Sequence, residues 1–104
     1  MLLSYNKLIQ LIDDGVINAQ KRLVNGASVD ITLSNVILTQ DEGIGIVKLY
    51  IKQKPVMRQM VIEDGYVLYP GDFILAASNE VFNLPNNIAA EYKLKSSMAR
   101  SGLE

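Results

Sequence analysis

Apolar residues near the start of the chain recur at the spacing of an amphipathic helix. The positions that form this stripe are Leu8, Ile9, Leu11 and Ile12. Ser4 precedes them, where its hydroxyl can accept a hydrogen bond from a free N–H group of the first helical turn. Gly15 follows them, where a helix often ends in a left-handed residue. The pattern predicts a short helix over residues 4–14.

From residue 29 onward the apolar pattern changes to a period of two, which is typical of β-strands. Val29, Ile31 and Leu33 alternate with polar residues, and residues 36–38 continue as a short apolar run. A second clear alternation covers residues 47–52, with lysines on its polar side. Because lysines mark a solvated strand face or a protected sheet edge, the segment is predicted to be a half-buried strand.

Turn-forming residues separate these segments from further apolar ones. The expected turns are Asp41-Glu42-Gly43, Asp64-Gly65, Pro70-Gly71 and Pro85-Asn86-Asn87. The expected strand segments around them are 61–62, 66–69, 73–77 and 88–94. The chain therefore reads as one short helix followed by about six strands. This predicts a mainly β fold, of the sandwich or barrel kind, in a single domain over residues 1–104.

Composition removes several classes of chemistry. The 104 residues carry ten Lys and Arg against eleven Asp and Glu, for a net charge of −1, and include no Cys and no His. Thiolate or imidazole metal sites, disulfides and Ser-His-Asp triads are therefore excluded. The near-neutral charge argues against a nucleic-acid partner or an anionic membrane surface. No apolar stretch has the length of a signal peptide or a membrane span, so we expect a cytoplasmic protein.

The segment 95–100 concentrates polar chemistry near the end of the chain. It places two hydroxyls, Ser96 and Ser97, between the cations Lys95 and Arg100. Hydroxyls, cations and backbone N–H groups at a strand-to-helix junction can bind phosphate oxygens. Alternatively, a serine caps a helical turn while the two cations are solvated, and from composition alone this is the commoner arrangement.

A second polar segment opens the expected strand at residue 29. Asn25-Gly26 is a turn signal, and Ser28 and Asp30 lie two residues apart on one strand face. This pair could serve a site or a subunit contact, or it could cap the turn. The Pro70-Gly71 turn is assigned a structural role only.

Taken in order, these segments resemble the N-terminal portion of the dCTP deaminase family, within the dUTPase-like superfamily. The resemblance spans nearly the whole chain, and its closing motif, Lys-Ser-Ser-x-Ala-Arg-x-Gly-Leu, is the most specific part. The matching pieces are residues 1–4, 11–15, 25–33 and 69–76, then Glu80, Leu84-Pro85 and residues 95–103.

The resemblance implies an incomplete dUTPase-like β-barrel, or β-clip, fold with one short N-terminal helix. It also implies a homotrimer or higher homo-oligomer with sites between subunits, and conversion of dCTP to dUTP and ammonia, or to dUMP in some members. Mg²⁺ is expected with the triphosphate, and zinc is not, which agrees with the missing His and Cys. The implied catalytic residues are Ser96 and Arg100. The implied nucleotide-binding residues are Lys95, Ser96, Ser97, Met98, Ala99 and Arg100.

In the family, the catalytic glutamate and further strands follow this motif, whereas the present sequence ends at Glu104. Glu104 falls too early to be that glutamate. We therefore expect the C-terminal strands to be lacking and these 104 residues to be inactive in deamination, for want of an acid/base group. Two other functions stay open: a non-catalytic nucleotide-binding regulator or inhibitor, and a structural trimer, for example in a viral particle.

Overall fold

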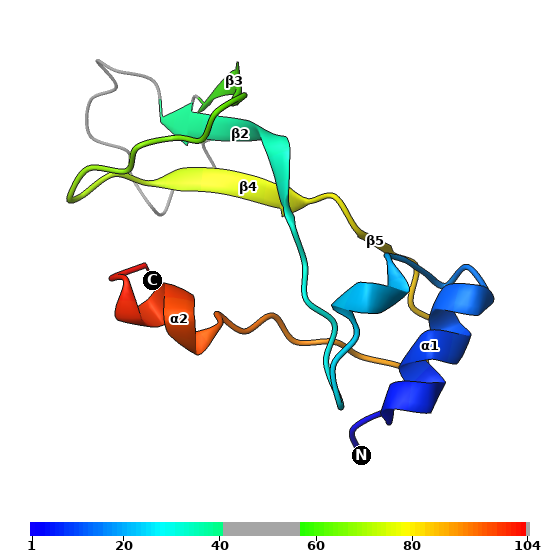
Figure 1. The fold of residues 1–104 in the computed structure, drawn as a ribbon. Helices are drawn as coiled ribbons and strands as arrows, with labels where there is room; N and C mark the ends of the chain where they lie inside the picture. Colours follow the sequence, from blue (N-terminus) through cyan, green and yellow to red (C-terminus); the bar gives the residue numbers. More distant parts are fainter. Residues whose placement is uncertain (41–56, 104) are drawn as a thin grey trace, which may run out of the picture.

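The computed structural model describes residues 1–40 and 57–103 of the chain. Within them the elements follow one another as shown in Figure 1. The helical elements are α1 (Tyr5–Asp13), the 3₁₀ turn η1 (Lys21–Leu23) and α2 (Ser96–Arg100). The strands are β1 (Ile17–Asn18), β2 (Leu33–Gln40), β3 (Met57–Val61), β4 (Ile74–Ser78) and β5 (Val81–Phe82). The described residues are thus mainly β, as predicted.

Helix α1 confirms the predicted N-terminal helix. The backbone N–H of Lys7 donates to the Ser4 hydroxyl at 3.3 Å, so Ser4 is the N-cap. Leu8 and Leu11 are buried on the inner face of the helix. Gly15 has a φ of 77°, the left-handed conformation that its position after the helix required.

The larger sheet is antiparallel and has the strand order β3-β2-β4. Its central strand carries Ile37, which is only 1% exposed and lies opposite Met60 on one side and Ala76 on the other. The pairing of β2 with β4 shifts register between Leu33 and Ile37. Such an irregularity bends the strand, and Figure 1 shows the chain turning away from the sheet at the start of β2.

A smaller layer lies at the N-terminal end. Strands β1 and β5 pair in antiparallel fashion, with Ile17 opposite Phe82, beside α1. Five of the six buried apolar side chains of the described residues belong to this end of the chain: Leu8, Leu11, Ile17, Leu23 and Val24. The main apolar core therefore lies around α1 and η1, and the larger sheet contributes Ile37.

Several strand predictions are wrong. Residues 30–32 are not in a strand, and Ile31 and Leu33 are 41% and 57% exposed, so the alternation from residue 29 did not mark a buried face. Residues 66–69 and 88–94 also form no strand, because neither segment finds a pairing partner among the described residues. The predicted turn at 41–43 and strand at 47–52 lie outside the described residues. The short ribbon of β1 with β5 was not predicted.

The expected turn at Pro70-Gly71 is confirmed. The backbone N–H of Asp72 donates to the Tyr69 carbonyl at 2.9 Å, and the Asp72 carboxylate accepts from the Tyr69 N–H at 2.9 Å. Gly71 has a φ of 86°, which requires glycine at the third turn position. This turn leads directly into β4.

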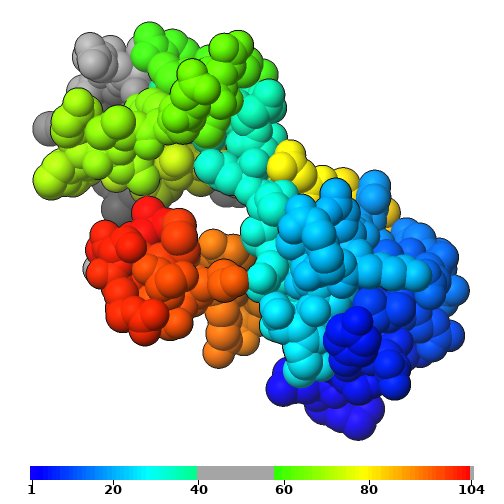
Figure 2. Space-filling model, in the orientation of Figure 1, coloured from blue at the N-terminus to red at the C-terminus, as the bar shows by residue number. Residues whose placement is uncertain are grey.

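Large apolar side chains are exposed over the segment from β3 to β4. Those between residues 61 and 75 are Val61, Tyr66, Val67, Leu68, Tyr69, Phe73 and Leu75. The Cα radius of gyration is 17.0 Å, against about 13 Å for a compact domain of this length. Figure 2 shows an opening between the start of β2, the stretch before α2 and α2 itself. The apolar surface is thus larger than a closed monomer would leave.

None of the helices within residues 1–40 and 57–103 is long and apolar enough to cross a membrane.

Candidate functional site

The structure gathers the predicted nucleotide-binding residues on α2 and the residue before it. Lys95 is the N-cap of this helix, and its carbonyl accepts from the backbone N–H groups of Met98 and Ala99 at 3.0 Å each. Neither Ser96 nor Ser97 caps the helix, so the interpretation of this segment as a serine cap is wrong. The two hydroxyl side chains and Arg100 are exposed. They make no hydrogen bond or ion pair with any residue that the structure describes.

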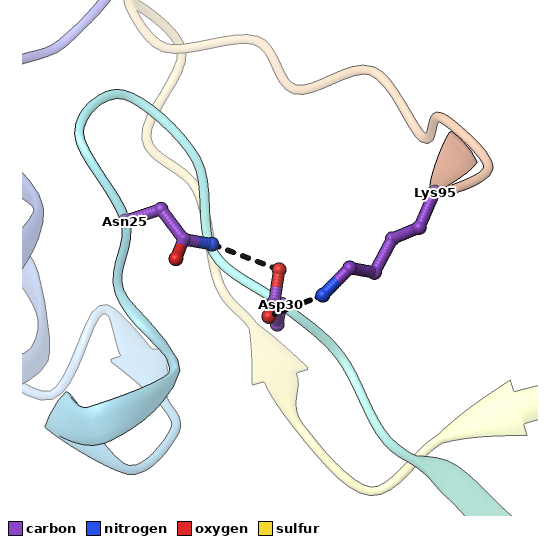
Figure 3. A network of polar contacts seen from close by, with 3 residues as sticks. All are labelled: Asn25, Asp30 and Lys95. Carbon is purple, nitrogen blue, oxygen red and sulfur yellow. Dashed lines mark hydrogen bonds and ion pairs between the residues drawn. The ribbon is translucent and has the colours of Figure 1, made fainter. Parts of the chain in front are cut away.

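The Lys95 side chain is not a free cation in solvent, because it forms an ion pair with Asp30. Its ammonium nitrogen Nζ lies 2.9 Å from Oδ2 of Asp30, across 65 residues of sequence. The second carboxylate oxygen, Oδ1, accepts from Nδ2 of Asn25 at 2.8 Å. Figure 3 shows Asp30 between its two partners, with the Lys95 side chain extended toward it. Each oxygen of Asp30 thus has its own donor.

The hairpin around Asn25 fixes the position of this carboxylate. Val24 and Val29 form a β-bridge, and the Asn25 N–H donates to the Ser28 carbonyl at 2.8 Å. The Asp30 N–H donates to the Leu23 carbonyl, also at 2.8 Å. Of the predicted polar pair, Asp30 joins the network by its side chain, whereas Ser28 takes part through its carbonyl. The hydrogen bond from Lys95, then that from Asn25, hold the pKa of Asp30 below its usual value of 3.8, against the opposing effect of partial burial.

A second carboxylate, that of Glu80, is buried and has a structural role. It lies just before β5, and its oxygens accept from the Thr32 N–H at 2.9 Å and the Thr32 hydroxyl at 2.7 Å. The Thr32 hydroxyl in turn accepts from the Asn79 side chain at 3.0 Å. The Thr32 N–H lowers the pKa of Glu80 below its usual 4.5, burial opposes this, and the Thr32 hydroxyl adds to the lowering. Glu80 thus fastens the β4–β5 turn to the chain entering β2.

A cleft of about 530 Å³ lies beside Glu80 and does not include the predicted nucleotide-binding residues. It is lined by Asn18, Ala19, Gln20, Arg22, Leu23, Thr32, Asn79 and Glu80. The positions of residues 95–100 as nucleotide ligands therefore stay a prediction. Among residues 1–40 and 57–103, no three acidic side chains converge to hold a metal ion.

The contact between Asp30 and Lys95 was missed by the sequence reasoning, although both segments were singled out. No local pattern links two residues that lie 65 positions apart. The signal available was the opposite charge of the two segments, which does not specify pairing.

Comparison with known proteins identifies the family. A family model described as "dCTP deaminase-like" matches residues 2–104. A protein of Methanospirillum hungatei named "dCTP deaminase, dUMP-forming" is 38% identical over 84 residues, covering 79% of this chain and 45% of that protein. A protein of the same name from Corynebacterium glutamicum is 30% identical over 109 residues, covering 99% of this chain and 58% of that protein.

A third relative of that name, from Nanoarchaeum equitans, is 48% identical over 44 residues, or 42% of this chain and 22% of its own. The chain thus spans about half the length of the relatives that it matches over most of its own length. The mainly β structure, with its short N-terminal helix, agrees with a partial dUTPase-like fold. Because the family model matches residues 2–104, including the Lys95–Arg100 segment, the chain belongs to the dCTP deaminase-like family.

Proposed function

We propose that this protein binds dCTP through residues 95–100, as a member of pyrimidine deoxynucleotide metabolism. The observation that carries the proposal is the family match through this segment, which presents two cations and two hydroxyls within six residues. Lys95 and Arg100 would make charge-assisted hydrogen bonds to the triphosphate, and Ser96 and Ser97 would add neutral donors. The names of the relatives support dCTP as the substrate of the complete site and dUMP as the product.

The reaction named for the relatives indicates which chemical groups a complete site needs. Deamination adds water at C4 of the cytosine ring and releases ammonia, and a further hydrolysis of dUTP yields dUMP and pyrophosphate. Both steps need a group that takes up and returns protons. The carboxylate that contacts the start of this segment, among the described residues, is that of Asp30, which is paired with Lys95 and has a lowered pKa. We propose that Ser96 and Arg100 orient the reacting base and that these 104 residues alone do not turn over dCTP.

The proposed role of Mg²⁺ is confined to the nucleotide. Mg²⁺ prefers six oxygen ligands and keeps several waters when it accompanies phosphates. Among residues 1–40 and 57–103 no acidic cluster offers a protein cage. The ion would arrive with the triphosphate, and Lys95 and Arg100 would bind the remaining phosphate charge.

The first test is a thermal unfolding titration with dCTP and Mg²⁺. A ligand bound only by the folded state stabilises it by about 2.7 kcal/mol at one hundred times its Kd, so the Tm rises with dCTP concentration. The same titration with dATP is the control for unspecific triphosphate binding. An unchanged Tm up to millimolar dCTP contradicts the proposed function. Ammonia release, measured on the same samples, tells a binding protein from an active deaminase.

We further propose that the protein is a homo-oligomer, most simply a trimer. The many large apolar side chains exposed between residues 61 and 75 and the large radius of gyration support this, because apolar surface gathered in one region of a protein often marks an interface. Light scattering after size exclusion should give three times the chain mass of 11.5 kDa. A monomer at all concentrations contradicts the proposal. A trimer that binds no nucleotide would instead favour the structural function.

A further inference from the structure

Among the residues that the structure describes, one polar contact attaches the segment that carries the proposed nucleotide site. Of the hydrogen bonds and ion pairs among residues 1–40 and 57–103, the Lys95–Asp30 contact alone joins residues 84–103 to the rest of the chain. The other hydrogen bonds of this stretch are local, such as that from the Ser101 hydroxyl to the Ser97 carbonyl. This contact is therefore the polar link by which the described residues can hold the start of α2 in place.

The two ends of the contact differ in how firmly they are held. Asp30 is fixed by the hairpin, since its backbone N–H binds the Leu23 carbonyl and its Oδ1 accepts from Asn25. Its side chain is 30% exposed, whereas that of Lys95 is 63% exposed. Lysine has a flexible stem and an ammonium with three donors. Asp30 is thus the fixed point, and Lys95 is the group whose place it determines.

The geometry leaves Lys95 able to bind an anion while it is held. One of its three N–H donors is directed to Asp30 at 2.9 Å, and within residues 1–40 and 57–103 the other two have no partner and can donate to phosphate oxygens. Lys95 is also the N-cap of α2 and immediately precedes Ser96. Holding the Lys95 ammonium therefore restrains the start of the helix that carries both hydroxyls and Arg100.

We propose that Asp30 is a positioning residue of the nucleotide site: it anchors Lys95 and thereby orders residues 95–100 for the triphosphate. The proposal rests on the proposed function for its ligand. In the competing arrangement, the Asp30 carboxylate binds the Lys95 ammonium in place of phosphate, so the triphosphate must displace Asp30 before it can bind Lys95. The two arrangements predict opposite effects of removing the Asp30 charge on dCTP affinity.

The test is Asp30→Asn, studied by NMR relaxation and by dCTP titration. The asparagine carbonyl still accepts from Asn25, so the hairpin is retained while the ion pair is lost. We expect the amide order parameters of residues 96–102 to fall from about 0.8 to about 0.6 or below, as for a flexible segment. We expect dCTP affinity to fall about tenfold, since the ligand must then order the segment itself. Asp13→Asn is the matched control, because it removes a comparable surface ion pair, with Lys21, and should change neither quantity.

The charge reversal Asp30→Lys with Lys95→Asp separates positioning from a merely structural role. It restores an ion pair but not the hydrogen bond from Asn25, which a lysine cannot accept, so the order parameters of residues 96–102 should recover in part. The dCTP affinity should not recover, because a carboxylate then faces the triphosphate. Recovery of both quantities would mean that Lys95 only ties the segment down.

Unchanged order parameters in Asp30→Asn overturn the anchoring, and tighter dCTP binding by this variant overturns the positioning in favour of competition. If the wild-type protein binds no dCTP, the proposed function fails together with the nucleotide half of this inference. The order parameters, which are measured without nucleotide, still decide whether Asp30 anchors the segment.

Discussion

Replacing Glu80 by alanine is expected to lower the free energy of unfolding by about 2–4 kcal/mol, because two partly buried donors lose their charged acceptor. Both carboxylate oxygens of Glu80 accept from Thr32, from its N–H and from its hydroxyl. Without them the Thr32 N–H is left partly buried and unpaired, and the β4–β5 turn loses its attachment to the chain entering β2. Thermal or denaturant unfolding measures the loss, which corresponds to a Tm about 8–20 °C lower.

Two controls make this result specific. Glu63 is exposed, so Glu63→Ala should unfold within about 0.5 kcal/mol of the wild type. Glu80→Gln keeps one carbonyl acceptor and should fall between the alanine variant and the wild type. Equal stability of Glu80→Ala and Glu63→Ala would contradict the structural role of Glu80.

The same carboxylate gives the stability a defined pH dependence. Hydrogen bonds from Thr32 lower the folded-state pKa of Glu80 below its usual 4.5, so the folded state favours the ionised form. The stability that it contributes is fully present above pH 4.5 and is lost as the pH falls through the lowered pKa. The difference in unfolding free energy between wild type and Glu80→Ala should therefore be constant near neutral pH and shrink in acid.

Replacing Arg100 by alanine is expected to weaken dCTP binding about tenfold to a hundredfold, with little effect on stability. A charge-assisted hydrogen bond contributes about 1.5–3 kcal/mol, and about 1.4 kcal/mol corresponds to a factor of ten in affinity. The Arg100 side chain is exposed and makes no polar contact with the described residues, so its removal should leave the Tm nearly unchanged. Isothermal titration with dCTP and Mg²⁺ measures the affinity.

Arg58 provides the matched control for this variant. It is an exposed arginine on β3, and its backbone carbonyl rather than its side chain accepts from Thr39. Arg58→Ala removes the same charge from the protein but should leave dCTP affinity within about twofold, the residual effect of net charge on binding. If both arginine variants bind dCTP like the wild type, Arg100 is not a nucleotide ligand.

The local features of the fold could be predicted from the sequence because they depend on interactions between neighbouring residues. Ser4 caps α1, Gly15 follows it in the left-handed region, and Pro70-Gly71 turns the chain ahead of β4. Each of these depends on side chains within a few residues of one another. A strand, in contrast, needs a partner, and the apolar segments 66–69 and 88–94 have none among the described residues. An apolar sequence alone could not reveal that.

The candidate site likewise has features that local sequence predicts and contacts that only the tertiary structure reveals. The sequence by itself determined the mainly β class, the N-terminal helix and the grouping of Lys95, Ser96, Ser97 and Arg100, since these follow from patterns within one segment. Only the tertiary structure decided that Asp30 holds Lys95 and that Glu80 is buried on Thr32. Both contacts join residues that are distant in sequence, and their pairing is fixed by how the hairpin, the sheet and the C-terminal segment come together in space.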